Sequence, residues 1–321
     1  MSPFKFVVGM VFLAAANLAC AQTWPAKPVK FIVPYPPGGT VDPLARLLGG
    51  KLQESLGQPF VVENRPGAGG LVGTGAAAKA PNDGYTFLFV FDNHSVNPAL
   101  VANVPFDTLK DFAPVMLVGT APYAIAAHPS RPFKSFAEVV RAAKAKPDAI
   151  SIGSIGNGTL AHLTLALAQQ AGGFRINHIP YKGGGPMTQD LLGGQVDLGI
   201  GSAALLTPHV RSGKVRAVAT TGEKRWPTLP DVPTLVEQGI PGVTVYAWWG
   251  ILAPAGTPQP ILDRFHSELR KALNLPEVRK ILTENIGMEL IVSSPEALQK
   301  WIVSEMQRWG KVVKDNGIKA D

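Results

Sequence analysis

Five times along the chain, an apolar run is followed by a glycine-rich turn and then by a helix pattern. The apolar runs are VKFIVPY, PFVVENR, YTFLFVF, AISIGS and INHIPY. In the first helix pattern, leucines at 44, 47, 48 and 52 recur at the spacing of one helix face. Strands that alternate with helices pair in parallel through right-handed crossovers. The pattern therefore predicts an α/β fold with parallel-type sheets flanked by helices.

Two longer apolar stretches, 113–129 and 243–258, interrupt this alternation, because neither has a helix pattern between its halves. Each is long enough to carry the chain from one lobe to another. We therefore expect two lobes joined by two crossing hinge strands, with a cleft between the lobes. The predicted first lobe is 22–119 plus 248–321, and the predicted second lobe is 120–247.

The start of the chain has the pattern of an export signal. Lys5 precedes eleven residues without a charge, too few to span a bilayer. Ala19-Cys20-Ala21 follows as a small-residue cleavage site. We expect residues 1–21 to be a signal peptide that is cleaved near Ala21. Lipid attachment at Cys20 is the alternative.

Composition narrows the chemistry. The chain has 321 residues, 46% of them hydrophobic and 17% charged, which is typical of a soluble globular protein. Its formal net charge of +7 is weak evidence for an anionic ligand, but the basic residues are scattered, so we expect no nucleic-acid partner. Cys20 is the single cysteine, and the six histidines show no H-x-x-x-H pair, so we expect neither a metal site nor a cofactor.

Two turns, PPGGT and GNGT, lead directly into helix patterns. Free backbone N–H groups and the positive end of a helix favour an anion there, and glycine lets a ligand approach the backbone closely. We therefore expect an anion site at these turns. A plain helix cap is the alternative role for Thr40 and for Asp42 in the next turn.

Other function classes are poorly supported by the motifs. ENRPGAGGLVGTG fails the strict dinucleotide fingerprint, and no G-K-[ST] follows it. The chain contains no G-x-S-x-G nucleophile motif, although a dispersed triad leaves a hydrolase open. We do not expect an enzyme.

Eight stretches in order resemble Bug-type (TctC-like) periplasmic solute-binding proteins of tripartite tricarboxylate transporters. They are WPAKPVKFIVPYPPGGTVDPLAR, GQPFVVENRPGAGGLVG, PNDGYTFLF, NPAL…PFDTLKDFAPVMLVG, GNGTLAHL, YKGGGP…DLLGGQVD, LPDVPTLVEQG and WWGILAPAGTP. The resemblance covers nearly all of the mature chain. It implies a two-lobe, type II-like periplasmic clamp that binds a small carboxylate and delivers it to two membrane subunits without an ATPase. We expect a monomer.

The resemblance also implies where the ligand lies. It places backbone groups of the first turn on the ligand carboxylate, the 156–159 turn on the opposite side, and the end of the third strand at the cleft. The residues expected to line the site are Tyr35, Pro36, Pro37, Gly38, Gly39, Thr40, Asp92, Asn93, His94, Ser154, Gly156, Asn157, Gly158, Thr159, Tyr181, Lys182, Gly201, Ser202 and Trp248. A solvated surface lysine is the alternative for Lys182, and internal packing is the alternative for His94 and for His162.

One position departs from the family pattern. Gly201 stands where many members carry an acid that can pair with a ligand amino group. Its absence favours a mono- or dicarboxylate, aliphatic or aromatic, over an amino acid, with Asp92 as a compensating charge. Trp248 and Trp249 point to opposite faces of a strand, so one is expected in the core and the other, taken as Trp248, on the cleft. A receptor for a sensor kinase, or an exported enzyme, remains the alternative to transport.

Overall fold

The computed structural model describes residues 24–317. The predicted signal peptide lies outside these residues. Ten strands form one continuous sheet in the order β2-β1-β3-β9-β4-β7-β5-β6, with β8 and β10 also paired to β4. The strands are β1 (Val29–Val33), β2 (Phe60–Asn64), β3 (Thr86–Phe91), β4 (Phe112–Ala127), β5 (Ser151–Ser154), β6 (Asn177–Pro180), β7 (Leu198–Ser202), β8 (Arg216–Thr220), β9 (Tyr246–Pro254) and β10 (Glu289–Leu290).

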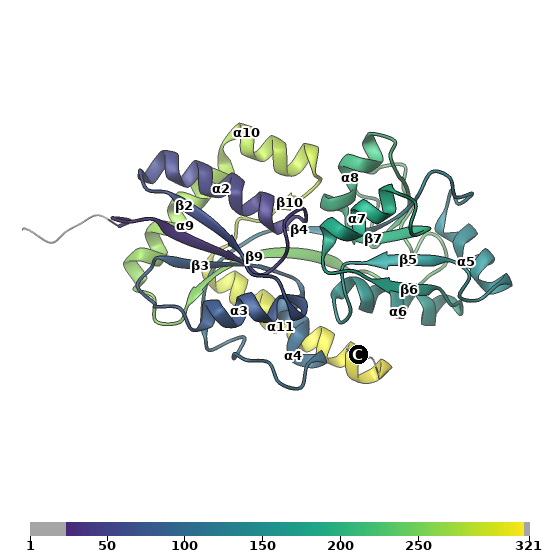
Figure 1. Cartoon of the computed structure of the whole chain (residues 1–321), viewed down its shortest axis with the longest axis horizontal. Helices are drawn as coiled ribbons and strands as arrows, with labels where there is room; N and C mark the ends of the chain where they lie inside the picture. Colours follow the sequence, from purple (N-terminus) through teal and green to yellow (C-terminus); the bar gives the residue numbers. More distant parts are fainter. Residues whose placement is uncertain (1–23, 318–321) are drawn as a thin grey trace, which may run out of the picture.

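Helices cover this sheet and follow the strands as the sequence predicts (Figure 1). They are α2 (Val41–Leu56), α3 (Leu71–Ala78), α4 (Asn93–Leu100), α5 (Phe136–Ala145), α6 (Leu160–Gly172), α7 (Gly184–Leu192), α8 (Ala203–Arg211), α9 (Gln259–Asn274), α10 (Pro276–Arg279) and α11 (Pro295–Asn316), with a 3₁₀ turn η1 (Ala68–Gly70) and a π-helical turn η2 (Lys280–Asn285). No helix within residues 24–317 combines the length and hydropathy needed to cross a bilayer.

The strand β4 changes partners along its length. Residues 112–122 pair with β9, and residues 123–127 pair with β7 and β8. One long strand thus enters both lobes beside β9, which confirms the two-lobe α/β fold with two crossing strands. The lobe boundaries at 119/120 and 247/248 stay a prediction.

The sheets are mixed, which refines the parallel arrangement predicted from sequence. The outer strands of each lobe, β2-β1-β3 and β7-β5-β6, are parallel. The crossing strands β4 and β9 are antiparallel to each other and to their outer neighbours β7 and β3. Strand β4 carries the chain into the second lobe and β9 carries it back, so the two strands run in opposite directions.

The first lobe has an aromatic core between the sheet and α9. Phe31, Phe87 and Phe265 are fully buried, and the rings of Phe87 and Phe265 lie 3.8 Å apart. Aromatic side chains bury large apolar areas, so this cluster holds α9 against β1 and β3. The lobe therefore presents the carboxyl ends of β1 and β3 from a rigid base.

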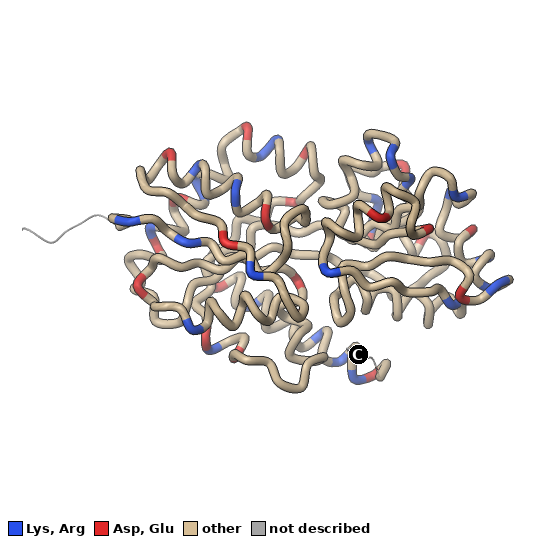
Figure 2. The backbone as a smooth tube through the Cα atoms, viewed as in Figure 1, with Lys and Arg blue, Asp and Glu red and all other residues tan. Residues whose placement is uncertain are grey.

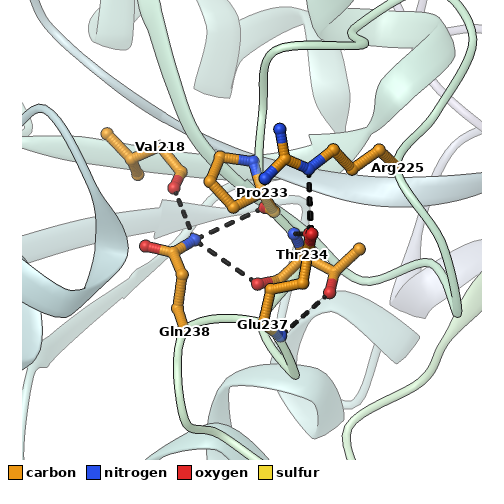
Figure 3. A network of polar contacts seen from close by, with 6 residues as sticks. All are labelled: Val218, Arg225, Pro233, Thr234, Glu237 and Gln238. Atoms are coloured by element: carbon orange, nitrogen blue, oxygen red, sulfur yellow. Dashed lines mark hydrogen bonds and ion pairs between the residues drawn. The ribbon is translucent and has the colours of Figure 1, made fainter.

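The stretch between β8 and β9 has no helix or strand of its own and is held by polar contacts. The Gln238 side-chain amide donates to the carbonyl oxygens of Val218 and Pro233 (Figure 3). Glu237 pairs with Arg225 at 2.9 Å and accepts from the backbone N–H of Thr234 at 2.7 Å. These contacts tie the irregular segment to the second lobe.

Basic and acidic residues are interspersed over both lobes (Figure 2). Within the described residues, no group of three or more His, Cys, Asp or Glu side chains is arranged to hold a metal ion.

Candidate ligand cleft

The first turn, residues 35–40, is fixed to the neighbouring loops of its own lobe. The Tyr35 hydroxyl donates to Asn93 Oδ1 at 2.6 Å and accepts from the backbone N–H of Phe91 at 3.2 Å. The Asn93 amide in turn donates to the carbonyl oxygen of Gly69, and the Asn64 amide donates to the carbonyl oxygen of Tyr35. Three loops at the carboxyl edge of the sheet are therefore bonded together.

Thr40 precedes α2 without capping it. Its side chain makes no cap hydrogen bond, and its hydroxyl instead accepts from Trp249 Nε1 at 2.9 Å. Trp249 thus reaches from the crossing strand to the first turn. Trp248 points to the other face, is fully buried, and belongs to the core cluster with Leu298 and Ile302 of α11. Trp249 is also buried, but it, not Trp248, is the member of the pair that contacts the first turn.

Asp92 ends β3 but does not face solvent. It is fully buried, its Oδ2 accepts from the Tyr123 hydroxyl at 2.7 Å, and its Oδ1 has no hydrogen-bond partner among the described residues. Burial raises the pKa of Asp92 well above its usual value. The sequence argument that Asp92 supplies a compensating charge is therefore wrong, because this environment favours the neutral acid.

His94 is also turned into the core. Its ring stacks 6.0 Å from Phe106 and meets Phe112 edge-on at 5.6 Å, and neither ring nitrogen has a hydrogen-bond partner among the described residues. Burial lowers the pKa of His94 to about 3. His94 is therefore a neutral core residue rather than a donor to a ligand.

The turn after β5 in the second lobe is shaped by its own polar side chains. Thr159 caps α6 by accepting from the backbone N–H of His162, and its hydroxyl donates to the carbonyl oxygen of Gly156 at 2.7 Å. The Ser154 hydroxyl lies 2.6 Å from His178 Nε2, and the rings of His162 and His178 stack 4.5 Å apart. Burial, and then the neighbouring His162, lower the pKa of His178 to about 4. The stacked rings therefore support the turn, with His178 in its neutral form.

The turn after β6 packs directly beside the turn after β5. The Gly183 backbone N–H donates to the carbonyl oxygen of Ile155 at 3.1 Å. The Tyr181 hydroxyl is occupied by Asp190 at 2.7 Å, and burial raises the pKa of Tyr181 to about 12. Lys182 is exposed, as is Asn157. Of these residues, the backbone near Gly183 and the exposed side chain of Lys182 remain available to a ligand.

The two lobes meet through glycines. A Cβ atom on Gly183 would lie 2.7 Å from Pro36 Cγ, and one on Gly185 would lie 2.8 Å from the carbonyl oxygen of Pro37. A Cβ on Gly38, whose φ is +87°, would lie 3.3 Å from the Cα of Gly185. The 36–39 turn thus packs directly against the glycine backbone of 183–185. The two lobes are therefore closed against each other at these turns.

The turn after β7 carries Gly201 where the family pattern has an acid. Ser202 caps α8 by accepting from the backbone N–H of Leu205. A Cβ at Gly201 would point at Leu205 Cδ2, 2.8 Å away, and at Met187 Cε, 3.3 Å away. Apolar groups therefore fill the direction in which an acid at 201 would project.

Comparison with known proteins shows the family to which a chain with this site belongs. The sequence model described as "Tripartite tricarboxylate transporter family receptor" (TctC) matches residues 44–318. The chain belongs to this receptor family. Protein BugT of Bordetella pertussis strain Tohama I is 38% identical over 99% of both chains. Two solved structures superpose closely. Periplasmic binding protein BugD is 36% identical with a TM-score of 0.87, and the match covers 92% of this chain and 99% of that one. R. palustris Rpa4515 with adipate is 35% identical with a TM-score of 0.88, and the match again covers 92% of this chain and 99% of that one.

This TctC-family receptor contains site features that its sequence did not single out. Trp249, Tyr123 and Gly185 contact predicted site residues from elements distant in sequence, and Leu205 lies against the predicted residue Gly201 and against Gly184 of α7. The GGG run at 183–185 was a usable signal for close backbone approach. The other three depend on which face each strand or helix turns, which the sequence leaves open.

A cavity of about 300 Å³ adjoins the first turn of the receptor. It is lined by residues of both lobes and of the π-helical turn: Gly38, Gly39, Thr40, Pro43, Leu44, Leu47, Ala204, Leu205, Pro208, His209, Ile281, Leu282 and Ile286. In Figure 1, α2 and α10 face α8 across the junction where it lies.

Proposed function

We propose that this chain captures a small organic carboxylate between its two lobes in the periplasm and delivers it to the two membrane subunits of a tripartite tricarboxylate-type transporter. The observation that carries the proposal is the convergence of backbone at the 36–40, 155–159 and 183–185 turns, each of which leads into a helix N-terminus. Backbone N–H groups and the positive helix end stabilise an anion without a charged side chain.

The relatives support the same class of ligand. Rpa4515, which shares the fold at a TM-score of 0.88, was solved with adipate. A clamp that closes over a carboxylate also needs small residues where its lobes meet, and the Gly38–Gly185 contact meets that need. The ligand-contacting set that we propose keeps the backbone of 36–40, 156–159 and 183, with the side chain of Lys182; Trp249 is buried and holds Thr40 in place. Asp92, His94 and Trp248 are left out because their side chains are buried in the core.

Thermal unfolding of the mature protein, stripped of ligand by unfolding and refolding, tests the proposal. A panel of succinate, adipate, benzoate and aspartate is compared with neutral amides of similar size. A ligand at 100 times its dissociation constant adds about 2.7 kcal/mol to the free energy of unfolding, which shifts the midpoint clearly. A response confined to the amides, or to no compound, would contradict carboxylate capture.

A matched pair of variants at Gly39 locates the site. No atom lies within 4 Å of a Cβ built at Gly39, and its φ is not in the left-handed region, so the backbone tolerates a side chain. Gly39→Asp places a negative charge at the proposed carboxylate position, whereas Gly39→Asn adds similar bulk without the charge. We expect Gly39→Asp to abolish binding and Gly39→Asn to weaken it less. Equal affinity in all three proteins would exclude the first turn as the site.

A further inference from the structure

The interlobe cavity beside Thr40 has an apolar lining. Leu44 and Leu47 of α2 form one wall, Leu205 of α8 forms the opposite wall, and Ile281 and Ile286 close the side. None of the residues that line this cavity is Asp, Glu, Lys or Arg. The lining His209 has a pKa that is lowered by burial and then by Lys214, so it is uncharged near neutral pH. Apolar surface of this kind favours hydrocarbon over water.

The missing acid at 201 extends the same apolar wall. Leu205 lies against the backbone of both Gly201 and Gly184, since Cβ atoms there would sit 2.8 Å and 2.9 Å from its Cδ2. Met187 is fully buried behind it. A ligand that reaches Leu205 from the first turn therefore meets methyl groups, not a partner for an amino or hydroxyl group. A polar group placed there would lose its hydrogen bonds to water without replacement.

Lobe contacts flank the cavity. On one side the 36–39 backbone meets Gly185. On the other side Trp226 Nε1 of the second lobe donates to the carbonyl oxygen of Gly287 at 2.7 Å, and Arg211 donates to the carbonyl oxygen of Glu284. A molecule in the cavity therefore contacts both lobes, and closure removes its surface from water. This is the geometry in which apolar burial couples ligand binding to lobe closure.

We propose that this cavity holds the apolar body of the ligand, so that the receptor selects carboxylates with an aliphatic chain or an aromatic ring over amino acids and hydroxy acids. The inference rests on the proposed function, because the carboxylate itself is taken to lie at the first turn. Its wall is shared: Gly38, Gly39 and Thr40 line the cavity as well as the proposed carboxylate position.

Calorimetric titration of acetate, butanoate, hexanoate, benzoate and aspartate into the refolded mature protein tests the inference. Each methylene that enters the cavity strengthens binding about fourfold, so hexanoate, which has two more methylenes, binds about fifteenfold more tightly than butanoate. Aspartate binds more weakly than butanoate. The variant Leu47→Ser, on a half-buried helix position, lowers hexanoate affinity about fivefold or more and leaves acetate within about twofold.

Two further variants make the test specific. Ile281→Ser alters a different part of the cavity lining at a residue that is 37% exposed, so it is expected to fold and to act as Leu47→Ser does. Val61→Ser removes an apolar side chain of β2 that is 53% exposed and does not line the cavity, so it is expected to leave the series unchanged. The inference is overturned if Val61→Ser lowers hexanoate affinity as much as the cavity variants do. It is also overturned if affinity does not rise with chain length, or if Leu47→Ser and Ile281→Ser leave that rise unchanged. Carboxylate capture stands in each of these cases. If no carboxylate binds at all, the proposed function fails and the inference with it.

Discussion

Replacing Gly185 by alanine perturbs lobe closure with little effect on either lobe alone. Gly185 lies in the first turn of α7 with a φ outside the left-handed region, so alanine fits its backbone. The added Cβ would lie 2.8 Å from the carbonyl oxygen of Pro37 and 3.3 Å from the C and Cα atoms of Gly38. All three atoms belong to the other lobe, so the collision exists only when the lobes are closed.

The size of the effect follows from these distances. Non-bonded carbon contacts are optimal near about 3.5–4.0 Å, so the facing backbone at Pro37 must retreat by several tenths of an ångström. Overpacking of this kind costs about 1–3 kcal/mol. Because the cost falls on the closed form alone, ligand affinity is expected to drop about 5- to 150-fold. The unliganded protein loses nothing, and alanine gains up to about 1 kcal/mol over glycine within the helix.

Titration calorimetry with the best ligand of the carboxylate panel measures the affinity, and urea unfolding without ligand measures the stability. Small-angle scattering with saturating ligand then reports whether Gly185→Ala remains more open than the wild type. Gly50→Ala is the matched control, since Gly50 lies in α2 with no atom within 4 Å of a built Cβ. Unchanged affinity in Gly185→Ala would show that these loops do not meet in the liganded protein. A loss of unliganded stability as large as the loss of binding energy would likewise refute a closure-specific effect.

Three further changes test the buried polar groups. Because burial lowers the pKa of His94 to about 3, its neutral form stabilises the fold above the unfolded-state pKa near 6.5, and this contribution is lost as the pH falls below 6.5. Between about pH 7 and pH 5, the free energy of unfolding of the variant His94→Phe should therefore fall by about 2 kcal/mol less than that of the wild type, as measured by urea unfolding. The pKa of Asp92 is raised by burial, so its protonated form stabilises the fold at low pH and this contribution is lost as the pH rises through that raised pKa. Asp92→Asn, which still accepts from Tyr123, should accordingly be more stable than the wild type near neutral pH, with the advantage shrinking toward about pH 4 in the same assay. Thr40→Val leaves Trp249 Nε1 unpaired and should cost about 1–3 kcal/mol in urea unfolding, whereas Thr40→Ser should retain most of the stability.

The fold could be predicted because its signals are local. Each apolar run with its following turn and helix is read from neighbouring residues, and the two runs without a helix marked β4 and β9. The antiparallel direction of these two strands could not be read, because it depends on how the chain returns between lobes. The positions of the turns at the carboxyl edges of β1, β5 and β6 followed from the same rule that aligns parallel strands.

The side chains of the site were harder to predict, because their facing is decided by distant elements. The alternation of Trp248 and Trp249 predicts opposite faces, but α11 decides which face is core. A polar residue at the end of β3 suggests a cleft, yet Tyr123 from the crossing strand covers Asp92. His94 follows the same strand end, and the aromatic rings near the start of β4 enclose it.

At the cleft, backbone groups and side chains have different roles in determining which ligand the receptor binds. At the meeting of the 36–39 and 183–185 turns, a Cβ on Gly183 or on Gly185 would collide with the facing turn, so these two positions are held to glycine and offer only backbone groups. Groups common to every residue recognise what every ligand of the class shares, its carboxylate. They cannot distinguish one acid from another. Selectivity must then come from the nearest positions that can carry side chains, which here are Leu47 on α2, Leu205 on α8 and Ile281 on the π-helical turn. Substitutions at these three positions should therefore change which carboxylate binds, whereas substitutions at the glycines should change whether any binds.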